Sequence, residues 1–292
     1  MLADTSGEVY RAFRPGNRVP RMVLQLSRRG LSRVRWLTMK IVLARDYQHL
    51  SRLGASLVTR AIKQKPNLVL GLATGETPLG LYQELVKLYR QGNLDFSRVV
   101  TFNLDEYYGL PPDDPHSYHY YMETNFFKHV NLRRENVHLP PGRPENVVAA
   151  CAAYEAAIAA AGGIDLQILG IGQNGHIGFN EPGAALNATT HLVDLAPETI
   201  LANARFFSCV EEVPRRAISM GIGTIMKARR ILLLASGEDK ALAVAQALEG
   251  PVTTRVPASL LQLHPCVTVI LDRAAAGQLN GKTNREEEPV CC

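Results

Sequence analysis

Short apolar runs alternate with longer amphipathic segments along most of this chain, from residue 39 to residue 271. Continuous apolar runs are typical of strands buried on both faces, and the segments between them have the length of helices. We expect helices at residues 47–63, 77–90, 117–129, 147–161 and 239–248, the second with Thr77 as N-cap and Pro78 at its first position. We expect strands at residues 39–43, 68–72, 99–104, 164–169, 230–235 and 267–271.

This order of elements predicts an α/β fold, because strands separated by helices form a parallel sheet that is covered on both faces. Neither an internal repeat nor a low-complexity linker interrupts the pattern. We therefore expect a single domain at residues 39–280, followed by a polar tail at residues 281–292. No apolar run reaches the ~18 residues that a membrane-spanning helix needs, so we expect no membrane partner.

The positive charge of the chain is concentrated at its start. The net charge is +5, but residues 1–38 hold eight arginines, no lysine and two acids, a charge of +6 that leaves −1 for residues 39–292. We therefore expect no nucleic-acid partner for the main domain. The Arg-rich extension at residues 1–38 has three interpretations: an upstream segment with Met39 as the true start, an acid-poor targeting peptide, or a basic arm that contacts a partner.

Cysteine usage indicates a reducing compartment. The five cysteines are odd in number and scattered along the chain. Their spacing fits neither a disulfide framework nor a zinc site. We therefore expect reduced thiols, a cytoplasmic location and no metal.

The first candidate site is a turn at the end of a predicted strand. Residues 71–78 read Gly-Leu-Ala-Thr-Gly-Glu-Thr-Pro and lead into a helix. Free backbone N–H groups and the helix dipole at such a turn suit a phosphate, although an ordinary capped turn would have the same features. It is not a Walker A loop, because no Gly-Lys-Ser/Thr follows.

Two acids follow the apolar run at residues 99–104. Asp105 and Glu106 are neighbours in an extended segment, so their side chains should face opposite ways. One can act as a general base in a pocket, while the other orients it or pairs elsewhere. A turn-capping aspartate is the alternative.

Four glycines surround a histidine directly after the strand at residues 164–169. Residues 170–182 read Gly-Ile-Gly-Gln-Asn-Gly-His-Ile-Gly-Phe-Asn-Glu-Pro. His176 suits proton transfer near neutral pH, and a carboxylate follows at Glu181. The glycines also match the dinucleotide fingerprint, but Gly178 and Pro182 argue against the helix that a nucleotide site needs. Ligands bind beyond the carboxyl ends of parallel strands, so we expect the three candidate segments to share one pocket.

Two cations complete the candidate set. Arg205 and Lys240 would each be an ordinary surface charge if taken alone. Together with the turn at Thr74 they could hold a phosphate monoester.

These residues together resemble a known family, the glucosamine-6-phosphate deaminases. The motifs that carry the resemblance are Leu-Ala-Thr-Gly-x-Thr-Pro (72–78), Phe-Asn-Leu-Asp-Glu-Tyr (102–107) and Gly-x-Gly-x-Asn-Gly-His-Ile-Gly-Phe-Asn-Glu-Pro (170–182), with Arg205 and Lys240. The similarity covers about residues 39–275. It implies a Rossmann-like, three-layer α/β/α fold with a mostly parallel sheet. It also implies conversion of glucosamine 6-phosphate and water to fructose 6-phosphate and ammonia, with no metal or organic cofactor.

The resemblance further implies a role for each candidate residue. Asp105 would take the proton from C2 of the open-chain sugar and pass it to C1. His176 would assist opening of the pyranose ring, with Glu181 orienting it and Asn174 beside it. The 6-phosphate would be held by Thr74, Gly75, Thr77, Arg205 and Lys240.

Two positions depart from the family pattern. Asn174 stands where some relatives have an aspartate. Its oxygen can accept a hydrogen bond from the imidazole but carries no charge, so we expect His176 to depend more on Glu181. Glu76 occupies a loop position where small residues are usual, and its charge would repel a phosphate unless the side chain points outward.

Two other functions fit parts of the sequence. A 6-phosphogluconolactonase has the same fold and also binds a sugar phosphate, but the Asp-Glu-Tyr and Phe-Asn-Glu-Pro motifs favour the deaminase. A sugar-phosphate-sensing regulator would need a helix-turn-helix or a similar reader, and residues 1–38 contain none. The oligomeric state stays open between a monomer and a homo-oligomer.

One regulatory prediction follows from the resemblance. Allosterically activated relatives bind a phosphorylated effector through basic residues downstream of Asn-Glu-Pro, whereas residues 190–194 here read Thr-His-Leu-Val-Asp. We therefore expect N-acetylglucosamine 6-phosphate to leave the initial rate of ammonia release unchanged at low substrate concentration. A clear rise in that rate would contradict the prediction.

Overall fold

The structure is a computed structural model that describes residues 22–23, 35–36, 38–280 and 285–286. The chain divides into two units, Met1–Leu37 and Thr38–Cys292. In the first unit, β1 (Met22–Val23) pairs antiparallel with β2 (Arg35–Trp36). The rest of the Arg-rich extension, and most of the tail predicted at residues 281–292, lie outside the described residues.

The second unit contains an eight-stranded sheet in which every neighbouring pair is parallel. The predicted parallel sheet is therefore confirmed, and each predicted strand lies within two residues of its expected bounds. The order across the sheet is β13 (Arg285–Glu286), β3 (Thr38–Leu43), β12 (Cys266–Leu271), β11 (Ile231–Ala235), β8 (Leu166–Leu169), β4 (Val69–Leu72), β5 (Val100–Asn103) and β7 (Val137–His138).

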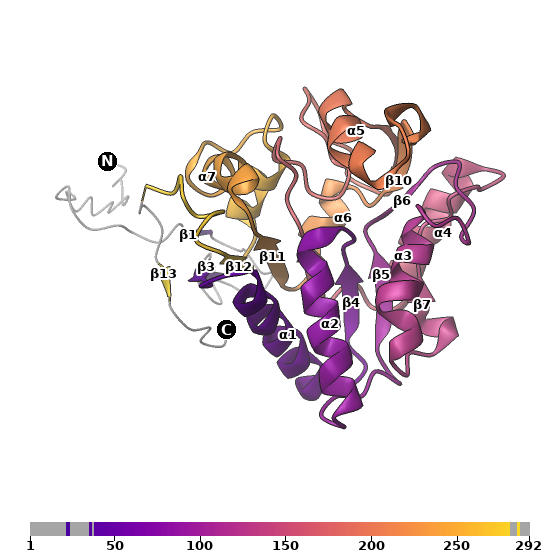
Figure 1. The fold of residues 1–292 in the computed structure, drawn as a ribbon, viewed down its shortest axis with the longest axis horizontal. Helices are drawn as coiled ribbons and strands as arrows, with labels where there is room; N and C mark the ends of the chain where they lie inside the picture. Colours follow the sequence, from indigo (N-terminus) through magenta and orange to yellow (C-terminus); the bar gives the residue numbers. More distant parts are fainter. Residues whose placement is uncertain (1–21, 24–34, 37, 281–284, 287–292) are drawn as a thin grey trace, which may run out of the picture. The chain divides into compact units, whose positions relative to one another are not determined.

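Helices cover both faces of this sheet, which confirms the α/β/α architecture (Figure 1). On one face α1 and α2 lie side by side, with Gly54 against Leu81 and against Leu234 of β11. On the opposite face Tyr154 of α4 packs edge-on against Phe102 of β5. The helices are α1 (Tyr47–Gln64), α2 (Glu76–Arg90), α3 (Tyr118–Asn125), α4 (Val147–Ala160), α5 (Pro197–Asn203), α6 (Ile222–Met226) and α7 (Ala241–Glu249).

Two predicted helices differ from the observed ones at their ends. The helix expected at residues 117–129 ends at Asn125, and a 3-10 turn, η1 (Phe127–His129), follows it. Phe126 leaves the helical conformation with φ −141, and its buried ring stacks on Tyr82 at 5.0 Å. The helix expected at residues 239–248 begins as the 3-10 turn η5 (Glu238–Lys240) before α7.

A second, three-stranded antiparallel sheet was not among the predicted elements. Its order is β6 (Asp105–Tyr107), β10 (Arg216–Ser219) and β9 (His191–Asp194). Leu104 joins it to the large sheet, because its N–H donates to Leu72 at 2.9 Å and its carbonyl accepts from Met220 at 2.7 Å. The chain therefore leaves β5 and enters β6 with Asp105 as the first residue past the carboxyl edge of the large sheet.

Candidate functional site

A cavity of about 740 Å³ opens at the carboxyl edge of the large sheet. Its walls are the loops after β4, β5, β8 and β11, together with α5 and η3 (Ala204–Phe206). Glu181 is the one candidate residue that does not line the cavity, and it lies behind His176. The candidates that line it are Thr74, Gly75, Thr77, Asp105, Asn174, His176, Arg205 and Lys240.

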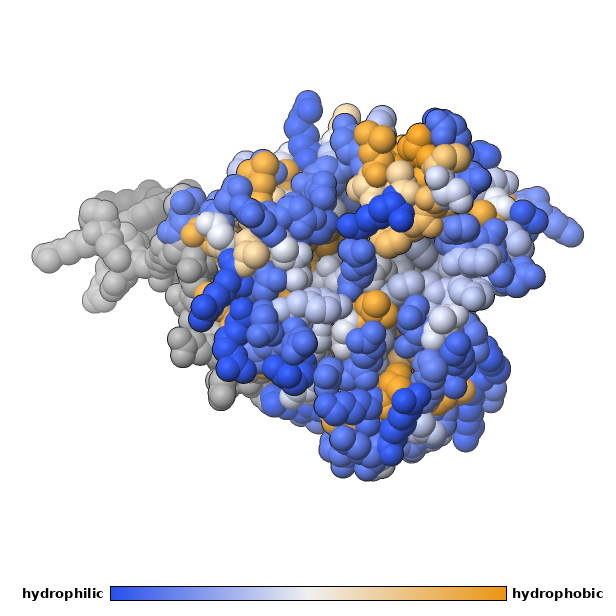
Figure 2. Space-filling model, viewed as in Figure 1, coloured by the Kyte–Doolittle hydropathy of each residue, from blue (hydrophilic) through white to orange (hydrophobic). Residues whose placement is uncertain are grey.

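An apolar surface adjoins the cavity on one side. Figure 2 shows apolar residues gathered over α5, whereas most of the surface in this view is polar. Leu201 of α5 is 66% exposed, and Phe206, which also lines the cavity, is 45% exposed. The apolar surface over α5 therefore reaches the cavity at Phe206, beside polar lining residues such as Glu198 and Asn203.

Asp105 is the acid that faces the cavity. The residue lines the cavity but is only 6% exposed. Burial, and next the nearby charge of Glu106, raise the pKa of Asp105 to about 8. A carboxyl group with this pKa gains and loses a proton near neutral pH, which suits general acid–base catalysis.

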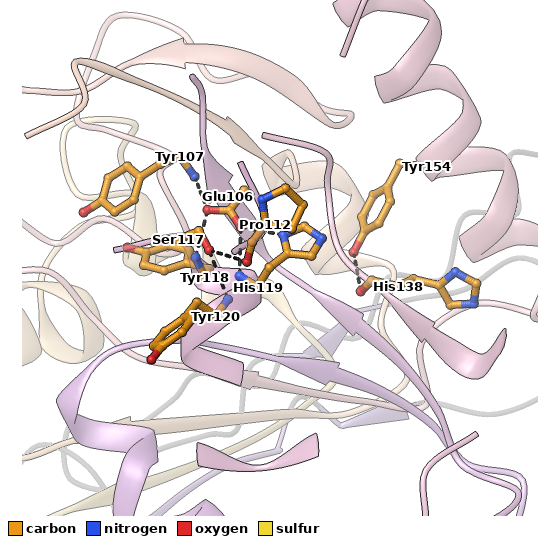
Figure 3. A network of polar contacts seen from close by, with 9 residues as sticks. All are labelled: Glu106, Tyr107, Pro112, Ser117, Tyr118, His119, Tyr120, His138 and Tyr154. Carbon is orange, nitrogen blue, oxygen red and sulfur yellow. Dashed lines mark hydrogen bonds and ion pairs between the residues drawn. The ribbon is translucent and has the colours of Figure 1, made fainter. Parts of the chain in front are cut away.

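Glu106 does not line the cavity, and its carboxylate contacts the start of the helix that follows (Figure 3). The residue is completely buried, and its carboxylate lies 2.6 Å from Nδ1 of His119. It also accepts hydrogen bonds from three backbone N–H groups, those of Tyr107, Tyr118 and His119. The two acids thus face opposite ways, as predicted, and Glu106 fixes the N-terminus of α3 beside the cavity.

A glycine-rich turn positions the His176 ring. Gly172 donates its N–H to the carbonyl of His176 and accepts a hydrogen bond from the N–H of Gly175. A Cβ atom at residue 172 would lie 2.3 Å from Cε1 of the imidazole, so any side chain there would displace the ring. Residues 170–182 contain no helix, so this segment lacks the structure of a dinucleotide fingerprint, as predicted.

Glu181 contacts both His176 and the polar groups beside it. Its Oε2 lies 3.4 Å from Nδ1 of His176 and accepts a hydrogen bond of 2.9 Å from Nδ2 of Asn174. Burial alone would raise the pKa of Glu181, but hydrogen bonds from His176, Thr199 and Asn174, with the charge of His176, lower it to about 2. Glu181 is therefore held as a carboxylate.

The structure corrects one expectation about Asn174. Its Oδ1 accepts from the backbone N–H of His176 at 3.2 Å, and among the described residues no hydrogen bond joins this oxygen to the imidazole. Asn174 therefore contacts the backbone of His176 and the carboxylate of Glu181, and the imidazole faces Glu181.

The turn after β4 also differs from the prediction. Helix α2 begins at Glu76 with Gly75 as its N-cap, so the prediction of Thr77 as N-cap is wrong. Gly75 has φ 106, which glycine adopts without strain, and this lets the helix start two residues earlier. Within the described part of the chain, the backbone N–H groups of Thr74, Gly75, Glu76 and Thr77 donate to no protein acceptor. Such a helix N-terminus suits an anion.

Both candidate cations are held beside acids at the cavity. Nη2 of Arg205 lies 2.9 Å from Oε2 of Glu76, and both side chains are more than half exposed. Nζ of Lys240 lies 3.1 Å from Oδ2 of Asp239, which also accepts from Nε2 of Gln173 at 3.0 Å. The charge of Glu76 is thus paired with Arg205.

Thr199 is a cavity residue that no sequence motif indicates. It is buried on α5, and its Oγ1 lies 3.5 Å from Nδ1 of His176. Its hydroxyl is also one of the groups that lower the pKa of Glu181. The sequence pattern does not predict α5, so only the fold brings this hydroxyl to His176.

Two further properties concern metals and membranes. Among residues 38–280 and the other described positions, no group of three His, Cys, Asp or Glu side chains is arranged to hold a metal ion. In the same part of the chain, no helix has the length and apolar character needed to cross a membrane.

Comparison with known proteins identifies the family. The model of a family described as glucosamine-6-phosphate isomerases/6-phosphogluconolactonase matches residues 45–270. The chain belongs to this family. The resemblance derived from the motifs is thereby confirmed.

Members of this family named glucosamine-6-phosphate deaminase are similar over their full length. One from Thermoanaerobacter pseudethanolicus is 54% identical over 252 residues, which are 86% of this chain and 100% of the relative. One from Halothermothrix orenii is 58% identical over 241 residues, which are 82% of this chain and 100% of the relative.

Solved structures of the family agree with the fold. A monomeric glucosamine-6-phosphate deaminase matches with a TM-score of 0.81 at 47% identity, over 82% of this chain and 100% of that one. A 6-phosphogluconolactonase from Leishmania guyanensis matches with a TM-score of 0.64 at 20% identity, over 85% of this chain and 100% of that one. The second likeness shows the fold alone.

The Glu106 network predicts a stability difference between two Glu→Gln variants on or beside α3. Glu106→Gln should lower the free energy of unfolding by about 2–3 kcal/mol, because it weakens charge-assisted hydrogen bonds in a buried site. Glu123→Gln removes an exposed ion pair with Arg134 and should change it by less than about 1 kcal/mol. Urea denaturation measures both, and equal losses would contradict the assignment.

Proposed function

We propose that this family member converts D-glucosamine 6-phosphate and water to D-fructose 6-phosphate and ammonia. The observation that carries the proposal is that Asp105 and His176 line one cavity whose wall includes a helix N-terminus suited to an anion. The full-length similarity to relatives named glucosamine-6-phosphate deaminase supports it.

Ring opening comes first and uses His176. The imidazole moves a proton between the ring oxygen and the C1 hydroxyl, which requires a group that exchanges protons near neutral pH. Glu181 faces Nδ1 of His176 and so orients the ring and stabilises its protonated form. Asn174 is neutral, so Glu181 supplies the carboxylate of this group.

Isomerisation follows and uses Asp105. The carboxylate takes the proton from C2 of the open-chain aldehyde, whose amino group is protonated. A proton moves from the ammonium nitrogen to O1, which gives an enolamine with a C1–C2 double bond and a hydroxyl on C1. The same group returns the proton to C1, so that C1 becomes a hydroxymethyl carbon and C2 an iminium carbon. Water adds to C2, and the C–N bond breaks to release ammonia and leave the ketone.

The 6-phosphate anchors the substrate at the other end of the cavity. Backbone N–H groups at the start of α2 and the side chains of Arg205 and Lys240 contact its oxygens. Thr74 and Gly75 in the turn, and Thr77 in the first turn of α2, present these backbone N–H groups. Binding energy at this remote group positions C1 and C2 at Asp105. Arg205 is paired with Glu76 in an exposed, weak ion pair, from which a phosphate dianion can draw it.

The lactonase alternative leaves Asp105 without a role. Hydrolysis of an ester at C1 requires no base at C2, whereas this chain places a buried carboxyl group with a raised pKa in the cavity. The 6-phosphogluconolactonase from Leishmania guyanensis is only 20% identical to this chain, a likeness of fold alone. We therefore favour the deaminase.

We further propose that the sugar phosphate is the partner of this site, with no nucleic acid, and that the chain works in the cytoplasm. The net charge of −1 over residues 39–292 supports the first statement. Among the described residues, the thiols of Cys151 and Cys209 form no disulfide, which supports a reducing compartment.

A substrate comparison tests the reaction. The purified protein should release ammonia and fructose 6-phosphate in equal amounts from glucosamine 6-phosphate, and leave 6-phosphogluconolactone unchanged. Asp105→Asn should abolish ammonia release and still bind the substrate. Absence of ammonia with the unaltered protein, or full activity in the variant, would exclude this assignment.

The pH dependence tests Asp105 as the base. Only the ionised carboxylate can take the C2 proton, and its pKa is about 8. We therefore expect kcat/KM to rise about tenfold per pH unit below this pKa and to level off above it. Initial rates at low substrate concentration over about pH 6 to pH 9 measure this, and a flat profile would be the contrary result.

A further inference from the structure

Three tyrosines from three different helices donate hydrogen bonds to backbone carbonyls in the turn between β4 and α2 and at the first residue of α2. The hydroxyl of Tyr82 donates to the carbonyl of Ala73 at 2.6 Å. The hydroxyl of Tyr121, on α3, donates to the carbonyl of Gly75 at 2.6 Å. The third bond comes from α1, where the hydroxyl of Tyr47 donates to the carbonyl of Glu76 at 2.7 Å. We call Tyr47, Tyr82 and Tyr121 the tyrosine cradle.

Tyr47 makes a second hydrogen bond inside the first turn of α2. Its hydroxyl accepts from the N–H of Gly80 at 2.8 Å, so it bridges Gly80 and Glu76, the pair that a regular helix joins directly. A Cβ atom at residue 80 would lie 2.9 Å from this hydroxyl and 2.3 Å from Oγ of Ser51. The phenol of Tyr47 is therefore seated in space that exists because residue 80 is glycine.

The cradle also determines where the N–H groups of the turn point. In a trans peptide the C=O of one residue and the N–H of the next point in opposite directions. A carbonyl held by a phenol therefore turns the following N–H away from that phenol. The N–H groups fixed in this way are those of Thr74, Glu76 and Thr77, which donate to no acceptor among the described residues.

The peptide that most needs this restraint is the one after Gly75. Glycine has more backbone freedom than any other residue, so this peptide can rotate and present its carbonyl to the cavity instead of the N–H of Glu76. A carbonyl oxygen facing a phosphate dianion would repel it. Burial raises the pKa of the Tyr121 phenol, which therefore stays protonated and remains a donor at neutral pH.

We propose that Tyr47 and Tyr121 are positioning residues for the 6-phosphate, holding the peptides of Gly75 and Glu76 so that their N–H partners face the bound anion. This inference rests on the proposed phosphate site. It adds two residues that act through the backbone: Tyr47 lines the cavity, but its hydroxyl, like that of Tyr121, bonds to backbone groups of the turn and of α2. It assigns a binding role to two hydroxyl groups that lie outside the sequence motif at residues 72–78.

Inorganic phosphate is the probe for this role, because it occupies the anion site without engaging Asp105 or His176. We expect Tyr47→Phe and Tyr121→Phe each to raise KM for glucosamine 6-phosphate and the inhibition constant of inorganic phosphate by about 3- to 10-fold, the effect of one lost hydrogen bond. Both should leave kcat within about twofold, because the bonds position the anion and not the reacting carbons.

Tyr154→Phe is the matched control. Tyr154 is buried, whereas Tyr47 and Tyr121 are partly buried. It likewise donates its hydroxyl to a backbone carbonyl, that of Asn103 at 2.6 Å, but away from the turn. It should lower the thermal midpoint and leave the inhibition constant of phosphate at the wild-type value. An equal rise in that constant for Tyr154→Phe would reveal general loosening and overturn the inference.

The remaining outcomes distinguish failure of the positioning role from failure of the proposed phosphate site. If inorganic phosphate inhibits the unaltered protein competitively, but with the same constant in both cradle variants, the positioning role is overturned and the phosphate site stands. If inorganic phosphate does not compete with glucosamine 6-phosphate in the unaltered protein, the phosphate site is overturned and the positioning role falls with it.

Discussion

The geometry of the site depends on Leu104, whose N–H and carbonyl form hydrogen bonds with two different sheets. Its N–H belongs to the parallel sheet through Leu72, while its carbonyl belongs to the antiparallel sheet through Met220. Asp105 and Glu106 follow at once, where alternation sends one side chain into the cavity and the other to the N-terminus of α3. One backbone residue thus fixes the carboxyl group proposed as the base, the helix beside it and the junction of two sheets.

The surroundings of the two carboxyl groups in the proposed chemistry shift their pKa values in opposite directions. Asp105 is buried beside another acid, and no N–H or side chain of the described residues donates to its carboxylate, so its pKa rises to about 8. Glu181 is also buried, but its hydrogen-bond donors and the charge of His176 lower its pKa to about 2. In the proposed reaction, a base that removes a proton from carbon near neutral pH benefits from a raised pKa. A group that stabilises an imidazolium must stay ionised, which a lowered pKa ensures.

The large sheet and the site motifs could be predicted from the sequence, because both are local patterns. Buried strands are continuous apolar runs, and the candidate residues lie where those runs end. The small sheet could not, since β6 is Asp-Glu-Tyr and β9 is only partly buried. The Arg205–Glu76 pair, the position of Thr199 and the bonds of Tyr47 and Tyr121 join distant segments, and no local pattern encodes them.

The phenol of Tyr47 within the first turn of α2 has an evolutionary consequence. The space it fills is closed by any β-carbon at residue 80, and its loss would leave the carbonyl of Glu76 and the N–H of Gly80 to bond each other in an ordinary helix. Residues 47 and 80 therefore form a compensating pair. As the family diverges, the two positions should change together, even though 33 residues separate them.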